Sequence, residues 1–167
     1  MKTIIIFQLL FIMFLSCYKE NEHENENLQK SALKIILLKP FIDDSTITNI
    51  NGTWKVLSYE DYINDSVTLI SDVPPRLLPL NQDVIITFQN DSIYGKNTTN
   101  EVQGNYFLQK RNIKVLGFGG TKVGQPIWGD MFNSVIRKID SFAINSVRLR
   151  FYYNNSKNSL TLEKYNP

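Results

Sequence analysis

The chain has 167 residues, a formal net charge of +2 and one cysteine. Its basic residues are scattered, which argues against the stripe of Lys and Arg that nucleic-acid-binding domains carry. A single cysteine excludes a disulfide within the chain, so the folded part must rely on its hydrophobic core for stability. At this length we expect one ordinary domain with a sizeable core.

The first residues have the pattern of an export signal. Met1-Lys2 supplies positive charge, and residues 3–15 are almost wholly apolar. Such a run suits a signal-peptide core and is too short for a membrane span, which needs about 20 residues. It ends at a small residue, Ser16, followed by Cys17, the only cysteine of the chain. The alternative is an ordinary secretory signal with a chance cysteine.

The quartet Phe14-Leu15-Ser16-Cys17 resembles the lipobox of bacterial lipoproteins of the Bacteroidetes type, with Phe where Leu is usual. The resemblance implies removal of residues 1–16 and acylation of the cysteine thiol by fatty acids such as palmitate. It therefore implies a lipid-anchored envelope protein, in the outer membrane, whose first partner is the membrane itself. Two or more acyl chains make a stable anchor, whereas one chain binds membranes marginally.

Residues 17–47 are expected to form a tether. Within it, residues 18–27 are acidic and have almost nothing to bury, so we expect an extended, disordered segment. Lys19, Glu20 and Glu22 also resemble the acidic export signal of surface-exposed Bacteroidetes lipoproteins. A plain solvated spacer is the alternative to that signal.

His23 is the only histidine and lies in the tether without a second His or a free thiol nearby, so we expect no metal site. Residues 28–47 mix apolar and basic side chains, and two interpretations stay open. The first is a short amphipathic helix at the membrane surface. In the second, residues 35–38 pack on the following domain as a helix or an edge strand. Pro40 ends that element.

Residues 48–167 have the pattern of a β domain, with short β-branched and aromatic runs separated by turns rich in Asn, Asp and Gly. A segment with three prolines, 72–81, is expected to be a loop. We expect strands over 52–59, 67–70, 84–88, 92–94, 102–109, 113–118, 147–151 and 160–162. In the strand over 147–151, the alternation predicts that Val147 faces inward with Leu149 and Phe151, and that Arg148 and Arg150 face outward.

One amphipathic helix is expected over residues 126–140. Pro126 suits a first helical turn, and apolar residues recur at helical spacing from Ile127 to Ile139. We expect this face to cover the core of the sheet as a lid. Sequential hairpins with one helix predict a mainly β fold, an antiparallel meander of about eight strands that closes into a small barrel or a strongly curled sheet.

The order Phe88-x6-Gly95-x4-Asn100-x3-Gly104-x-Tyr106 resembles the META domain of bacterial heat-shock lipoproteins. The resemblance covers roughly the whole β domain and implies structural roles for these residues. The cysteines that many members carry are missing here, so their disulfide-like feature is absent. The family has no established catalytic residues, and none is carried over.

The pair Gly52-x-Trp54 resembles the opening of lipocalin-like barrels. In those proteins the Trp closes the bottom of the barrel. The resemblance thus implies the same architecture and a structural role for Trp54.

The sequence offers little catalytic equipment. A Ser or Cys hydrolase needs a base beside its nucleophile, but the only His is in the tether and the only Cys is expected to carry lipid. Glu60 and Asp61 are adjacent, so they would face opposite sides of a strand, and we expect both to be solvated. Residues 119–122, Gly-Gly-Thr-Lys, lack the spacing of a phosphate loop and are expected to form a turn.

We therefore expect a non-enzymatic module for binding or envelope maintenance that uses no cofactor and no metal. Besides the membrane, its partner would be a small apolar ligand or an envelope protein. Two alternatives remain. One is a small hydrolase with two carboxylates that converge in one cleft. The other is a protease-inhibitor-like lipoprotein that acts through an exposed loop such as 72–81.

Overall fold

The structure is a computed structural model that describes residues 24–74, 82–121 and 123–166. The chain divides into two compact units, Met1–Lys39 and Pro40–Pro167. The expected signal peptide and lipidation site lie outside the described residues, and so does most of the proline-rich loop. Ser16, Cys17, Lys19, Glu20, Glu22 and His23 all belong to that undescribed part.

Within the first unit, residues 24–38 are helical. The expectation of disorder over 18–27 is therefore wrong for residues 24–27. Helix formation is cooperative, so the good helix formers Leu, Gln, Lys and Ala that follow extend the helix back into the acidic segment. The helix ends shortly before Pro40, since a residue that precedes proline disfavours the α conformation. Among the described residues, no helix is long and apolar enough to cross a membrane.

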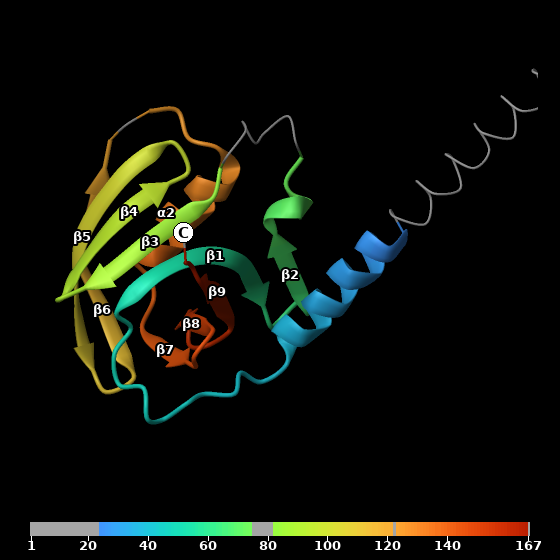
Figure 1. Cartoon of the computed structure of the whole chain (residues 1–167), viewed down its shortest axis with the longest axis horizontal. Coiled ribbons are helices and arrows are strands. Elements are labelled where there is room, and N and C mark those ends of the chain that lie inside the picture. Colours follow the sequence, from blue (N-terminus) through green and yellow to red (C-terminus); the bar gives the residue numbers. More distant parts are fainter. Residues whose placement is uncertain (1–23, 75–81, 122, 167) are drawn as a thin grey trace, which may run out of the picture. The chain divides into compact units, whose positions relative to one another are not determined.

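In the described part of the second unit, nine antiparallel strands curl into one ring-like sheet (Figure 1). The mainly β prediction is thus confirmed. The strands are β1 (Gly52–Asp61), β2 (Ser66–Leu69), β3 (Val84–Gln89), β4 (Ser92–Asn97), β5 (Asn100–Gln109), β6 (Asn112–Gly120), β7 (Ser141–Ile144), β8 (Arg148–Tyr153) and β9 (Asn158–Lys164). A short 3₁₀ turn, η1 (Ile70–Asp72), follows β2.

The strand β1 joins the two ends of the meander. It pairs with β9 from Trp54 to Asp61, while its other edge pairs first with β3 and then with β2. A bulge between Val56 and Ser58 shifts the alternation of side chains along the strand. As a result Trp54 and Val56 face the core before the bulge and Tyr59 does so after it, whereas Glu60 faces outward.

The helix α2 (Ile127–Ile136) lies between β6 and β7 in the chain and packs beside β3 (Figure 1). Its Trp128 ring meets Tyr59 edge-on at 4.8 Å, and its Phe132 ring meets Phe118 at 5.8 Å. Both α2 rings are fully buried, so the helix covers the core as predicted. It ends at Ile136 instead of residue 140.

The β6–β7 seam is the least bonded part of the ring. In the described chain the two strands share one residue pair, Asn112 with Ser141. The strand β7 is missing from the sequence prediction, because its four residues follow directly on the apolar helical pattern and look like its continuation. Gly119 and Gly120 belong to β6 and not to a turn, which corrects that expectation.

Aromatic and aliphatic side chains fill the interior of the ring. Trp54 is 1% exposed, and its Nε1 donates to the Ile50 carbonyl at 2.9 Å. The Lys164 ammonium lies 4.6 Å from the centre of the indole ring, a cation–π contact. The largest fully buried side chains of the ring include Trp54, Trp128, Phe88, Phe132, Phe151, Ile86, Ile93, Leu149 and Leu160.

Two expectations about exposure are wrong. The alternation predicts that Val147 faces inward, but Val147 lies before β8 and is 59% exposed. The sequence predicts a solvated Glu60, but Glu60 is 1% exposed, and Arg150, though on the outer face, is 2% exposed. The alternation of a strand predicts which face a side chain occupies, but it does not predict whether other segments cover that face.

Candidate functional site: an open pocket on the sheet

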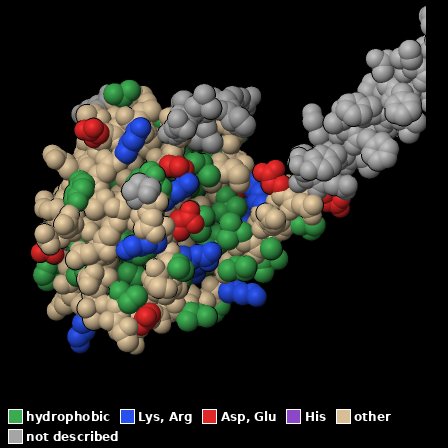
Figure 2. All heavy atoms as spheres, viewed as in Figure 1, with side chains coloured by type: hydrophobic (Ala, Val, Ile, Leu, Met, Phe, Trp, Pro, Cys, Tyr) green, Lys and Arg blue, Asp and Glu red, His purple; other side chains and the backbone are tan. Residues whose placement is uncertain are grey.

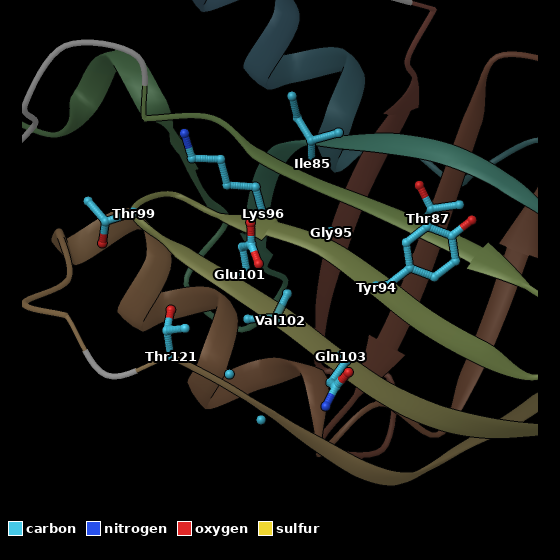
Figure 3. Close-up of a pocket in the computed structure, with 12 residues that line it drawn as sticks. Ile85, Thr87, Tyr94, Gly95, Lys96, Thr99, Glu101, Val102, Gln103 and Thr121 are labelled. Carbon is cyan, nitrogen blue, oxygen red and sulfur yellow. The ribbon is translucent and has the colours of Figure 1, made fainter.

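An open pocket lies on the outer face of β3, β4, β5 and β6 (Figure 3). Tyr94, Lys96, Glu101 and Gln103 line it, and all four are exposed. They alternate along their strands with core residues such as Ile93, because successive side chains of a strand point to opposite faces. The pocket is therefore built by the sheet itself and not by a mobile loop.

The lining combines apolar surface with a few polar side chains, and its charges balance. Lys96 and Glu101 stand directly opposite each other on β4 and β5, and they are the charged groups among the described lining residues. In the described part of the chain, the side chains of Lys96, Glu101 and Gln103 make no hydrogen bond or ion pair. These groups are thus available to a ligand. Over the visible face of the domain, acidic and basic side chains are interspersed (Figure 2).

The two ends of the pocket differ in chemistry. Thr99 and Thr121 lie at one end, and Thr87 and Tyr94 lie at the other (Figure 3). The Tyr94 hydroxyl donates to Gln89 Oε1 at 2.7 Å, which fixes the orientation of a ring that is 44% exposed. This end therefore offers an apolar ring face to solvent.

Asn100 ties the opposite end together. It is 2% exposed, and its Oδ1 accepts from Thr121 Oγ1 at 2.9 Å and from the Val123 amide at 2.8 Å. Its Nδ2 donates to the Val123 carbonyl and to Gln125 Oε1. The side chain thereby fastens the segment that leads into α2 to the β4–β5 turn.

Gly95 and Gly104 stand where neighbouring strands approach too closely for a side chain. A Cβ on Gly95 would lie 2.2 Å from the Ile85 carbonyl oxygen, and the φ of Gly95 is +154°. A Cβ on Gly104 would lie 2.1 Å from the Gly117 carbonyl oxygen. Only glycine fits such contacts. Gly95 lines the pocket, whereas Gly104 does not line it.

Tyr106 lies in the core and not in the pocket. It is 3% exposed and packs edge-on against Phe88, with ring centres 5.4 Å apart. Its hydroxyl donates to Asn51 Oδ1 at 3.3 Å, and burial raises the pKa of Tyr106. The five residues singled out in the META-like pattern thus spread over core, turn and strand contacts and form no single site.

A second polar cluster lies on the outer face of β1, β8 and β9. The Glu60 carboxylate accepts hydrogen bonds from the hydroxyls of Ser58 and Ser159. Arg150 Nε donates to Thr161 Oγ1 at 3.0 Å. Burial raises the pKa of Glu60, while the serine hydrogen bonds and the charge of Arg150 oppose the rise. These partners make the cluster a bonded network with its carboxylate already engaged.

Tyr62 completes this cluster. Its hydroxyl lies 2.7 Å from Ser159 Oγ and accepts from Arg150 Nη1 at 3.1 Å, and the guanidinium lies 5.0 Å from the centre of the Phe41 ring. Asp61 points elsewhere and accepts from the Asn64 amide, which lowers the pKa of Asp61.

Among the described residues, no group of three or more His, Cys, Asp or Glu could hold a metal ion.

Of the residues that the sequence analysis names, Gly95 lines the pocket, and its expected role is structural. Thr87, Tyr94, Lys96, Glu101 and Gln103 received no functional reading, although each sits at a polar position of an alternating strand. That alternation is a usable signal, but the pocket also requires the register of four strands. The register places these side chains together.

Comparisons with known proteins show the fold. The sequence matches no protein-family model, and no curated protein is similar to it. Among solved structures, a protein from Burkholderia xenovorans studied by NMR matches with a TM-score of 0.60 and 14% identity, over 77% of this chain and 93% of that one. A DUF4847 family protein from Bacteroides vulgatus ATCC 8482 matches with a TM-score of 0.52 and 14% identity, over 70% of this chain and 95% of that one. The shared fold supports the barrel-like description of the sheet.

Proposed function

We propose that this chain is a lipid-anchored envelope lipoprotein of the Bacteroidetes type, with a META-like domain that binds its partner without catalysis. The anchor is Cys17, at the end of the lipobox-like quartet. The ligand-binding part is the open pocket on β3 to β6. The protein acts at the outer membrane, where the acidic residues after the cysteine favour exposure at the cell surface.

One observation carries the binding role. The interior of the ring is packed with core side chains such as Trp54 and Phe88, while unengaged polar groups gather in the outer pocket. Ligand sites are concave and combine apolar surface with a few convergent polar groups. These observations on the described residues support a ligand site on the outer wall of the sheet.

No observation on the described residues favours the alternatives. A hydrolase of the paired-carboxylate type needs a second carboxylate beside Glu60, but Asp61 points away and is bonded to Asn64. Glu60 itself is engaged by two serine hydroxyls. The loop of the inhibitor hypothesis lies mostly outside the described residues.

The anchor is tested by metabolic labelling with a palmitate analogue in the bacterial host. We expect label on the wild-type chain and none on Cys17→Ser, which should leave the membrane fraction while keeping its fold. An unlabelled wild-type chain, or a Cys17→Ser chain that stays in membranes, would contradict the anchor.

The pocket is tested by thiol protection in intact cells. Ile85→Cys places a reporter thiol in the pocket at a position that offers a ligand no polar group, and Lys114→Cys places one on exposed β6 outside the pocket. For each variant, the rate of maleimide labelling in cells is divided by the rate for the purified protein. We expect a lower ratio for Ile85→Cys, because the natural ligand is present in cells. Equal ratios for the two variants would overturn the proposed binding site.

A further inference from the structure

Gly119 is a glycine that the sheet does not require. It lies in β6, lines the pocket and stands opposite Gln103. A Cβ built on Gly119 would meet no atom within 4 Å, and its φ lies outside the left-handed region. Glycine inside a strand weakens it, since it loses more conformational freedom on folding and packs no side chain.

The other two pocket glycines are explained by crowding. A Cβ on Gly120 would lie 2.0 Å from the Glu101 carbonyl oxygen, and Gly95 is similarly confined by Ile85. Gly119 has open space instead, so crowding by neighbouring atoms does not explain why this position has no side chain. Inside a strand, glycine marks a bulge, a bend, or a close approach by another backbone or a ligand. Gly117 borders the β5–β6 bulge, whereas Gly119 lies away from it and lines the pocket, which favours approach by a ligand.

The strands at the centre of the pocket cannot take an added strand. Both β4 and β5 are hydrogen-bonded to a neighbour on each side. A peptide that binds by β-augmentation needs an open sheet edge with free backbone groups. The ligand over Tyr94, Lys96, Glu101 and Gln103 must therefore be held by side chains.

These side chains suit one ligand chemistry. We propose that the pocket binds a neutral saccharide chain. This proposal rests on the proposed function, because it names the class of ligand for the same pocket. The exposed Tyr94 ring offers an apolar face for the C–H face of a sugar ring. The amide of Gln103 and the Glu101 carboxylate supply donors and acceptors for sugar hydroxyls. The hydroxyls of Thr99 and Thr121 donate within the protein, so they can add only acceptors.

The charge and the shape of the pocket narrow the class of ligand further. Lys96 and Glu101 balance each other, so the described lining has no excess of positive charge that would attract a polyanion. The pocket is open along the sheet, with polar groups at both ends, which favours an extended chain over a small apolar molecule (Figure 3). Gly119 leaves room for that chain against β6.

The test is native affinity electrophoresis of the full-length protein in detergent. Gels contain soluble β-glucan, α-glucan, mannan or xylan, and a parallel gel contains heparin as an anionic polysaccharide. We expect at least one neutral polysaccharide to retard the wild-type protein, and heparin not to do so. In Gly119→Val the dissociation constant for that polysaccharide should rise by about tenfold or more.

Gly117→Val is the matched control. Gly117 also lies in β6, a Cβ there also meets no atom within 4 Å, and it does not line the pocket. We expect both valine variants to keep or raise the melting temperature, since a β-branched residue suits an extended strand. Only Gly119→Val should lose binding.

Three results would overturn the saccharide proposal: retardation by heparin alone, equal retardation of wild type and Gly119→Val, or no retardation by any neutral polysaccharide. If Ile85→Cys is protected in cells while no polysaccharide binds, the saccharide class fails and the proposed binding site stands. If Ile85→Cys is unprotected in cells, the proposed function fails as well.

Discussion

Arg150 on β8 donates from Nε to Thr161 Oγ1 on β9 at 3.0 Å, and this contact holds a guanidinium group on the outer face of the sheet with 2% exposure. The buried carboxylate of Glu60 lies in the same cluster, and the charge of Arg150 stabilises its ionised form. A buried charge that loses its partner is strongly destabilising. The cluster therefore makes quantitative predictions about stability.

Arg150→Met should lower the free energy of unfolding by about 3–5 kcal/mol, because the buried cluster loses the hydrogen bonds to Thr161 and Tyr62 and the charge that favours ionised Glu60. Urea unfolding followed by tryptophan fluorescence measures this loss. Arg148→Met, on the same strand and the same face, is the control and should cost less than about 1 kcal/mol. Similar losses in the two variants would contradict an energetic role for the buried Arg150 cluster.

Glu60→Gln should change how stability depends on pH. Burial raises the folded-state pKa of Glu60 above its ordinary value of 4.5. Between 4.5 and the folded pKa, the folded state holds a proton that the unfolded state has released. The wild-type protein therefore loses stability relative to Glu60→Gln as pH rises through that window.

The measurement is a series of urea midpoints for both proteins from acidic to neutral pH. Asp61→Asn is a control of opposite sign, since the Asn64 hydrogen bond lowers the pKa of Asp61 below 3.8. Its stabilising contribution is present above 3.8 and is lost as pH falls through the folded pKa. A Glu60→Gln curve parallel to that of wild type would exclude a raised pKa at this site.

Gly95→Ala and Gly104→Ala should each destabilise the domain, because the new Cβ would overlap a carbonyl oxygen of the neighbouring strand. We expect a loss of about 1–3 kcal/mol or more for each variant. Gly117→Ala, where the space is open, should instead gain up to about 1 kcal/mol by reducing the entropy of the unfolded chain. Thermal melts of the three variants would show the difference, and a common sign would refute the crowding argument.

Trp54→Ala should cost about 3–5 kcal/mol. The indole is 1% exposed and donates to the Ile50 carbonyl, so truncation leaves both a cavity and an unpaired acceptor. Trp54→Phe keeps most of the volume and should recover much of the loss. Chemical denaturation measures both variants, and an unchanged midpoint for alanine would show that this ring does not support the core.

Local patterns predicted the strands well and the outer face poorly. Strands such as β3, with Val84, Ile86 and Phe88 at alternate positions, follow from hydrophobic period alone. Glu60 could not be placed in this way, because its partner Ser159 is 99 residues away in the sequence. Its burial depends on which strands become neighbours, and that is a property of the whole ring.

The pocket could not be predicted from the sequence for a related reason. Gly119 belongs to the pocket because it lies opposite Gln103, and Lys96 does so because it lies opposite Glu101. A shift of one residue in either register would turn one member of each pair toward the core. A pattern in one strand cannot specify its alignment with the next.

The short seam between β6 and β7 is the place where local opening of the ring should begin. The β1–β9 ladder runs along most of both strands, so thermal fluctuations that separate neighbouring strands should start at β6. The same strand forms one wall of the pocket. Binding of a ligand across the pocket from β4 to β6 would therefore slow hydrogen exchange at the amides of β6. The exchange rate of these amides would then indicate whether the pocket is occupied.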